Sequence, residues 1–242
     1  MRIRCFLPAL ALSAIIAGLG GCAAPPPPVS EKVQKYYDEH VANRTPTPTA
    51  APSATFAPSA TLAARAITFA AIGDSITQAD SPDIVNKAVG AGSWITYASV
   101  DGVEFAGGWA EGGAGTNAMA ASARPVVSDV LVVLAGTNDA ANGVPFEASA
   151  RNISAIVQAA SAKRVVVSAI PPLDEAPWIA ESFNAQLLAF VQQNGWTWVD
   201  GVAGVRTVDG VFAEGMTIDG VHPTERAARI IGESIRTVIL TG

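Results

Sequence analysis

From Ala66 onward, short apolar runs alternate with longer segments in which apolar residues recur every three or four positions. This alternation is typical of strands and helices that follow one another along the chain. Because the runs are apolar throughout, we expect a parallel sheet that is covered by helices on both faces. Four runs are predicted to be strands: Ile67–Ile72, Val130–Leu134, Arg164–Ile170 and Trp196–Asp200.

The segments between the apolar runs predict helices. Phe146–Ala160 and Trp178–Gln193 have helical periodicity. Another helix is predicted after Pro223, with Thr224 as its N-cap and Glu225 in the first turn, where an acidic residue is favourable. The apolar face of this last helix is expected to comprise Ala227, Ile231, Ile235 and Val238.

The first 65 residues follow a different pattern. Arg2 and Arg4 precede a strongly apolar run that ends in Leu19-Gly20-Gly21-Cys22, so residues 1–22 are predicted to be a signal peptide. The run is shorter than the roughly 20 residues that a spanning helix needs, which disfavours an uncleaved anchor. Residues 23–65 are rich in Pro, Thr and Ala and are predicted to be a linker. Residues 66–242 are expected to form one domain.

The end of the predicted signal peptide resembles the lipobox of bacterial lipoproteins. That resemblance implies that Cys22 becomes the first mature residue and carries the lipid. We therefore expect an exported protein that is held at the cell membrane by a lipid anchor and faces the cell wall or the extracellular side. An ordinary secretory signal, which would release a secreted protein, is the alternative.

Composition excludes several classes of protein. The chain has 242 residues, of which half are apolar and 15% are charged, and its formal net charge is −6. Without a basic patch, nucleic acid is not an expected partner. The only cysteines are Cys5 and Cys22, so the domain has no disulfide and no thiol nucleophile. With a single histidine as well, the domain is a poor host for zinc, and we expect no metal or cofactor.

Three short motifs supply the groups needed to attack an ester carbonyl. They are Gly73-Asp74-Ser75-Ile76-Thr77, Gly136-Thr137-Asn138-Asp139 and Asp219-Gly220-Val221-His222-Pro223. A serine hydroxyl needs a base to take its proton, imidazole is the usual base, and a carboxylate on the other ring nitrogen orients the ring. Of the two histidines, His40 precedes the Pro/Thr/Ala-rich stretch, which leaves His222 as the candidate base. Ser75 and Asn138 each follow a predicted strand, at the edge of the sheet where ligands bind.

With these motifs, residues 66–242 resemble the SGNH (GDSL-like) hydrolases, a family of esterases, lipases and carbohydrate deacetylases. The resemblance implies a flavodoxin-like three-layer α/β/α sandwich with a central parallel sheet. It also implies that Ser75 is the nucleophile, that His222 and Asp219 complete the triad, and that the Ser75 N–H and the Asn138 amide line an oxyanion hole. The glycine that completes the hole is expected in the stretch Gly107–Thr116, where Gly113 is favoured and Gly115 is the alternative.

The motifs disfavour the usual α/β-hydrolase fold, whose nucleophile elbow reads G-x-S-x-G, because Thr77 occupies the second position after Ser75. Asp74 and Asp139 are expected to organise loops by hydrogen bonding. Most tryptophans are expected in the core, although Trp109 and Trp178 are candidates to line a pocket.

We expect a monomeric serine esterase that hydrolyses short-chain acyl esters, because no apolar insertion remains to wall a deep acyl tunnel. The alternative enzyme is a deacetylase or acyltransferase whose substrate is an acylated carbohydrate of the cell wall. The alternative outside enzymes is a surface-tethered binding protein on a hydrolase scaffold.

Overall fold

The structure is a computed structural model and describes residues 65–242. Its centre is a five-stranded sheet with the strand order β2-β1-β3-β4-β5, and all neighbouring strands are parallel. This is the flavodoxin-like order of a doubly wound sheet, so the predicted three-layer α/β/α sandwich is confirmed. The strands are β1 (Ile67–Gly73), β2 (Val103–Ala110), β3 (Val130–Leu134), β4 (Arg164–Ser168) and β5 (Thr197–Val199).

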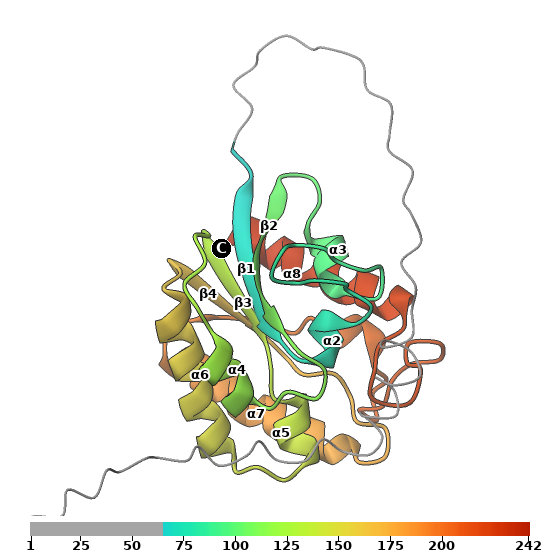
Figure 1. Ribbon diagram of the computed structural model, residues 1–242. Coiled ribbons are helices and arrows are strands. Elements are labelled where there is room, and N and C mark those ends of the chain that lie inside the picture. The colour runs from blue at the N-terminus through green and yellow to red at the C-terminus, as the bar shows by residue number, and fades with distance from the viewer. Residues whose placement is uncertain (1–64) are drawn as a thin grey trace, which may run out of the picture.

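Helices cover both faces of the sheet. In Figure 1, α3 and α8 lie on one side of the strands, and α4, α6 and α7 lie on the other. The helices are α2 (Ser75–Gln78), α3 (Trp94–Ala98), α4 (Thr116–Ser122), α5 (Thr137–Ala141), α6 (Phe146–Ala160), α7 (Pro177–Gln193) and α8 (Glu225–Thr241), with the short 3-10 helix η2 (Ala203–Val205).

The central strand β3 shows why its sequence is apolar throughout. Successive side chains of a strand point to opposite faces. Val130 and Val132 therefore pack with α3 and α8, whereas Leu131 and Val133 pack with α4, α6 and α7. Because both faces are buried, every residue of β3 is fully shielded from solvent, and the predicted bounds Val130–Leu134 are confirmed.

Helix α8 begins where the sequence predicted. The Thr224 hydroxyl accepts a hydrogen bond from the Ala227 N–H, and Glu225 lies in the first turn. The predicted apolar face is correct at Ala227, Ile231 and Ile235 but not in the last turn, where Ile239 is buried and Val238 is only partly buried. Ile239 lies eight residues after Ile231, so the buried stripe follows the helical period.

The edge strand β2 was not among the predicted strands, and it includes the first residues of the stretch Gly107–Thr116, in which the oxyanion glycine is expected. Glycine is depleted in strands, which hides this one in the sequence. A Cβ on Gly108 would lie 1.9 Å from the Ala71 carbonyl oxygen of β1, so only glycine allows this close pairing. Gly107 has φ +117° and lies opposite the register shift between Phe69 and Ala70. These glycines belong to the sheet, and the turn that follows is Glu111–Gly115.

The strand order places the site. The chain passes from β1 to β2 on one side and then to β3 on the other, so the crevice at the carboxyl ends of β1 and β3 is the switch point of the sheet. Gly73 and Leu134 are paired at the ends of these strands. The loops that carry Ser75 and Asn138 therefore leave the sheet side by side.

Candidate active site

Ser75 is the first residue of α2, directly after β1. The Asp74 carboxylate caps this helix by accepting a hydrogen bond from the Ile76 N–H at 3.0 Å. The turn is tight, because a Cβ on Gly73 would lie 2.0 Å from Thr77 Oγ1 and 2.9 Å from the Leu134 carbonyl oxygen. The Ser75 side chain is consequently held in a fixed position, and the residue is only 5% exposed.

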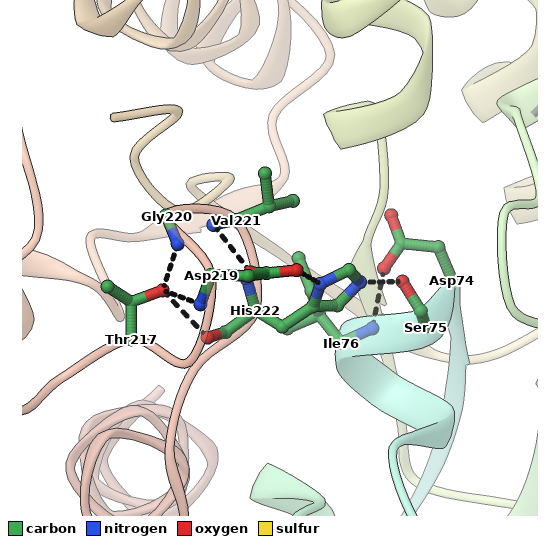
Figure 2. A network of polar contacts seen from close by, with 8 residues as sticks. All are labelled: Asp74, Ser75, Ile76, Thr217, Asp219, Gly220, Val221 and His222. Carbon is green, nitrogen blue, oxygen red and sulfur yellow. Dashed lines mark hydrogen bonds and ion pairs between the residues drawn. The ribbon is translucent and has the colours of Figure 1, made fainter. Parts of the chain in front are cut away.

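Ser75, His222 and Asp219 form one hydrogen-bonded chain (Figure 2). Ser75 Oγ lies 2.9 Å from His222 Nε2, and His222 Nδ1 lies 2.9 Å from Asp219 Oδ2. His222 is 1% exposed, so water hardly competes for its ring nitrogens. When Nδ1 carries the proton and donates it to Asp219, Nε2 has a free lone pair that faces the serine hydroxyl.

Backbone hydrogen bonds orient the Asp219 carboxylate. Its Oδ1 accepts from the His222 N–H at 2.8 Å and from the Val221 N–H at 3.0 Å, which leaves Oδ2 for the imidazole. Partial burial raises the pKa of Asp219, but the hydrogen bonds from the His222 ring and the backbone outweigh it and hold this pKa below its usual value. Asp219 therefore stays ionised wherever His222 can act as a base.

Two residues that sequence reasoning missed support this loop. Thr217 Oγ1 accepts from the Gly220 N–H at 2.8 Å and donates to the His222 carbonyl oxygen at 2.9 Å. The Asp174 N–H donates to the Gly220 carbonyl oxygen at 2.9 Å, from a segment 46 residues away in sequence. No local signal marks Asp174, because only the folding of the chain brings it to the loop.

Asn138 lies in the first turn of α5, after Gly136. Gly136 has φ +117°, and a Cβ there would lie 2.3 Å from the Phe183 ring, so glycine is required for both reasons. Asn138 is 3% exposed, and its Nδ2 donates to the Ala114 carbonyl oxygen at 3.0 Å. Asn138 is thereby fixed against the turn that contains the candidate glycines.

Both candidate glycines lie in this turn. The N–H of Gly112 donates to Gln78 Oε1 at 2.7 Å, and the N–H of Ala114 donates to the Glu111 carbonyl oxygen at 3.1 Å. Within residues 65–242, the N–H groups of Gly113 and Gly115 make no such hydrogen bond. Gly113 has φ +75°, a conformation that favours glycine. Both N–H groups are therefore available to an oxyanion, and Gly113 stays the favoured prediction.

Asp74 and Asp139 organise loops, as expected. Asp139 Oδ1 accepts from the Thr116 N–H at 2.9 Å, and its Oδ2 accepts from the hydroxyls of Thr116 and Ser149 at 2.5 Å each. These bonds join α5 to the first residue of α4 and to α6. Asp74 is fully buried beside Ser75, where its carboxylate caps α2.

A shallow groove lies between α5 and the first half of α7. It has a volume of about 240 Å³ and is lined mainly by apolar residues, among them Ala140, Phe146 and Trp178. Ala140 belongs to α5, so the groove lies beside the helix that carries Asn138. This volume is below the roughly 300–1,000 Å³ of typical ligand pockets.

The tryptophans differ from the expectation that most are core residues. Only Trp94 is fully buried, while Trp109, Trp196 and Trp198 pack against the core with part of their surface exposed. Trp178 is 65% exposed and lines the groove, as its sequence position suggested. Trp109 ends up on β2, packed against the core cluster.

Within residues 65–242, no group of three or more His, Cys, Asp or Glu side chains is arranged to hold a metal ion. In the same part of the chain, no helix has the length and apolarity needed to cross a bilayer. Cys22, the predicted signal peptide 1–22 and most of the predicted linker 23–65 lie outside the described residues.

Comparisons with solved structures identify the same fold in hydrolases. An acetylxylan esterase from Geobacillus stearothermophilus, solved as a catalytic mutant, is 15% identical with a TM-score of 0.59, over 72% of this chain and 94% of that one. An alpha/beta hydrolase enzyme from the metagenome of Lake Arreo is 16% identical with a TM-score of 0.60, over 74% and 98%. A GDSL-like lipase from Bacteroides thetaiotaomicron is 21% identical with a TM-score of 0.55, over 72% and 87%.

A search of curated proteins found no match. Among protein families, the model of the GDSL-like lipase/acylhydrolase family matches residues 71–230. This range contains Ser75, Asn138, Asp219 and His222 and most of the domain. The chain therefore belongs to the GDSL-like lipase/acylhydrolase family and is a hydrolase.

Proposed function

We propose that the protein is a serine esterase that hydrolyses short-chain acyl esters with Ser75 as nucleophile, His222 as base and Asp219 as the carboxylate that orients His222. The hydrogen-bonded chain of these three side chains at the carboxyl edge of the sheet carries this proposal. The same geometry argues against a binding protein without activity, because a binding site has no need of an activated serine.

The mechanism follows from the contacts. Ser75 Oγ attacks the acyl carbon while its proton passes to His222 Nε2, and a tetrahedral oxyanion forms. Collapse of this intermediate breaks the ester C–O bond, and His222 gives the proton to the departing alcohol. Water then attacks the acyl-enzyme with His222 again as base, which releases the acid and restores Ser75. Asp219 stabilises the imidazolium in both steps.

We assign the oxyanion hole to the backbone N–H of Ser75, the backbone N–H of Gly113 and the side-chain amide of Asn138. The Ser75 N–H and the Asn138 amide lie just after the ends of the paired strands β1 and β3. The hydrogen bond from Asn138 Nδ2 to the Ala114 carbonyl oxygen holds the Asn138 amide beside the turn Glu111–Gly115, which contains Gly113. Donors fixed in this way stabilise the developing negative charge without having to reorganise.

Asn138→Ala should lower kcat by about 10² to 10³ while the fold is retained, because removing one oxyanion donor typically has this effect. Steady-state kinetics on a soluble acetyl ester measures it. Asn194→Ala is the matched control, since Asn194 is exposed at the end of α7 and its amide bonds only the Phe190 carbonyl oxygen of its own helix. A raised KM with unchanged kcat would instead make Asn138 a substrate-binding residue.

The acyl group should be short. The segments between the motifs contain no long apolar insertion that could wall a deep acyl tunnel, so we expect only the first few carbons to be shielded, each of which adds at most about 0.8 kcal/mol. In a panel from acetyl to long acyl esters, kcat/KM should be highest from acetyl to butyryl, with Ser75→Ala as the blank. A clear preference for chains of roughly twelve carbons or more would contradict this and require a long hydrophobic groove.

An O-acetylated polysaccharide is the second candidate substrate, and exposed Trp178 favours it. An exposed indole offers a broad apolar face on which a sugar ring can pack. The similar structure of an acetylxylan esterase is consistent with this substrate class. Acetate release from an acetylated polysaccharide, compared with release from a small acetyl ester, tests it. A kcat/KM no higher on the polysaccharide would favour small esters.

We further propose that the enzyme is exported and anchored through a lipid on Cys22, as the residues before Cys22 suggest. Cys22→Ser should then release the protein from the membrane fraction or block its processing. Fractionation of cells and mass spectrometry of the mature N-terminus measure this. An unmodified N-terminus beyond Cys22 in the wild type would contradict the anchor and favour secretion.

A further inference from the structure

The first four residues of the turn Glu111–Gly115 form a β-turn that presents the Gly113 N–H. The Ala114 N–H donates to the Glu111 carbonyl oxygen at 3.1 Å, which closes the turn. Its third residue, Gly113, has φ +75°, whereas its second residue, Gly112, has no positive φ, which is the type II form. The Gly113 N–H therefore belongs to the central peptide group of the turn, and the position of the whole turn decides where this N–H points.

Gln78 anchors this turn to the helix that carries the nucleophile. Its Oε1 accepts a hydrogen bond from the Gly112 N–H at 2.7 Å, across 34 residues of sequence. Gln78 is half-buried in α2, three residues after Ser75. Residues three apart lie on the same face of a helix. The turn is thereby joined to the face of α2 from which the Ser75 side chain extends.

The two halves of the turn are held by different segments. Asn138 of α5 holds the second half by donating to the Ala114 carbonyl oxygen. In the first half, the bond from Gln78 is the only hydrogen bond in the described part of the chain that joins Gly112 or Gly113 to another segment. Two adjacent glycines have unusual backbone freedom, so this half of the turn depends on the Gln78 side chain for its position.

We propose that Gln78 is a positioning residue of the oxyanion hole, whose side-chain carbonyl holds the turn so that the Gly113 N–H keeps its place relative to Ser75. This role rests on the proposed esterase function, with Gly113 as one of the oxyanion donors. A donor stabilises the developing charge because it is already oriented, and small displacements of such groups cost rate. Gln78 acts through the backbone of the turn and needs no contact with the substrate.

Gln78→Met keeps the length of the side chain and removes the amide oxygen. On a soluble acetyl ester, kcat should fall about ten- to a hundredfold with little change in KM, less than the roughly 10² to 10³ expected when a donor is removed outright. A boronic acid that adds to Ser75 Oγ as a tetrahedral anion resembles the intermediate, so its inhibition constant should rise by a similar factor. The acidic limb of the pH profile, which reports His222, should not move.

Gly112→Pro tests the same hydrogen bond from its other partner. Proline is favoured at the second position of a type II turn and has no N–H, so this variant keeps the turn but cannot donate to Gln78. It should lower kcat by a factor similar to that of Gln78→Met. Because both changes break one bond, the double variant should lose little more than either single variant.

Gln158→Met is the matched control. Gln158 is exposed near the end of α6 that leads into β4, at the edge of the sheet opposite to Ser75. This variant should keep wild-type kcat, KM and boronic acid inhibition. Thermal unfolding of each variant shows whether the fold is retained.

A folded Gln78→Met enzyme with wild-type kcat would overturn the positioning role, and so would additive losses in the double variant. A raised KM with unchanged kcat would also overturn it, because Gln78 would then bind the substrate. If Gln78→Met does not fold, a Gly112→Pro enzyme with wild-type kcat would overturn the role instead. Ser75→Ala, assayed beside these variants, separates the two proposals: full activity there would refute the proposed function, whereas an inactive Ser75→Ala with a fully active Gln78→Met would refute only the role of Gln78.

Discussion

Ser75→Ala and His222→Ala should each lower kcat for ester hydrolysis by about 10⁶, and the double variant should lose little more. The hydroxyl and the imidazole are 2.9 Å apart and act as one unit, so removing either one ends proton transfer from the nucleophile. Residual hydrolysis above the uncatalysed rate would come from the oxyanion hole. Single-turnover and steady-state rates of the three variants on an acetyl ester measure this.

Ser161→Ala is the matched control, because this exposed serine ends α6 away from the site. It should retain wild-type kinetics. Substantial turnover by purified Ser75→Ala, or additive losses in the double variant, would mean that these two residues do not form the nucleophile and its base. Thermal unfolding of each variant shows whether the fold is retained.

Asp219→Asn should lower kcat by about 10⁴, although the side chain keeps its shape. The two oxygens of Asp219 have separate donors: Oδ1 accepts two backbone N–H groups and Oδ2 accepts the imidazole. If the amide oxygen of asparagine faces the backbone, its NH₂ group faces His222 Nδ1. Nδ1 must then accept a hydrogen bond, so the proton moves to Nε2, which can no longer take the serine proton.

The other orientation of the amide would place its NH₂ group against the N–H groups of Val221 and His222, where no acceptor remains. The backbone therefore selects the unproductive tautomer. The expected signature is a large loss of kcat with little change in KM. Asp101→Asn, which weakens an exposed ion pair with Arg236 just before the first residue of β2, at the other end of the sheet, should leave kcat unchanged. A loss below tenfold in Asp219→Asn would show that the tautomer is not held by Asp219.

The sheet could be predicted wherever a strand is buried on both faces. Such a strand has to be apolar at every position, and β3 shows this without ambiguity, so its ends were correct. β2 could not be found in this way. It lies at the edge of the sheet, and its paired glycines resemble a loop until the approach of the Ala71 carbonyl oxygen is known.

The helices could be predicted where their signals are local in the sequence. The bounds of α6 were correct, and the start of α8 was correct because its N-cap is a local feature. The buried face of α8 was misjudged only in its last turn, where packing on the sheet selects Ile239 over the neighbouring Val238. The partial exposure of Trp196 and Trp198 was likewise a matter of packing, since residue type alone favoured the core.

The sequence by itself determined the chemical groups of the candidate site, because a hydrolase of this kind needs a serine, a histidine, a carboxylate and oxyanion donors in recognisable local motifs. It also determined the sheet edge at which Ser75 and Asn138 lie. Only the tertiary structure decided the contacts between segments: Ser75 with His222 across 147 residues, Asn138 with Ala114 and Asp174 with Gly220. Such contacts depend on strand order and helix packing, which no local pattern of residues encodes.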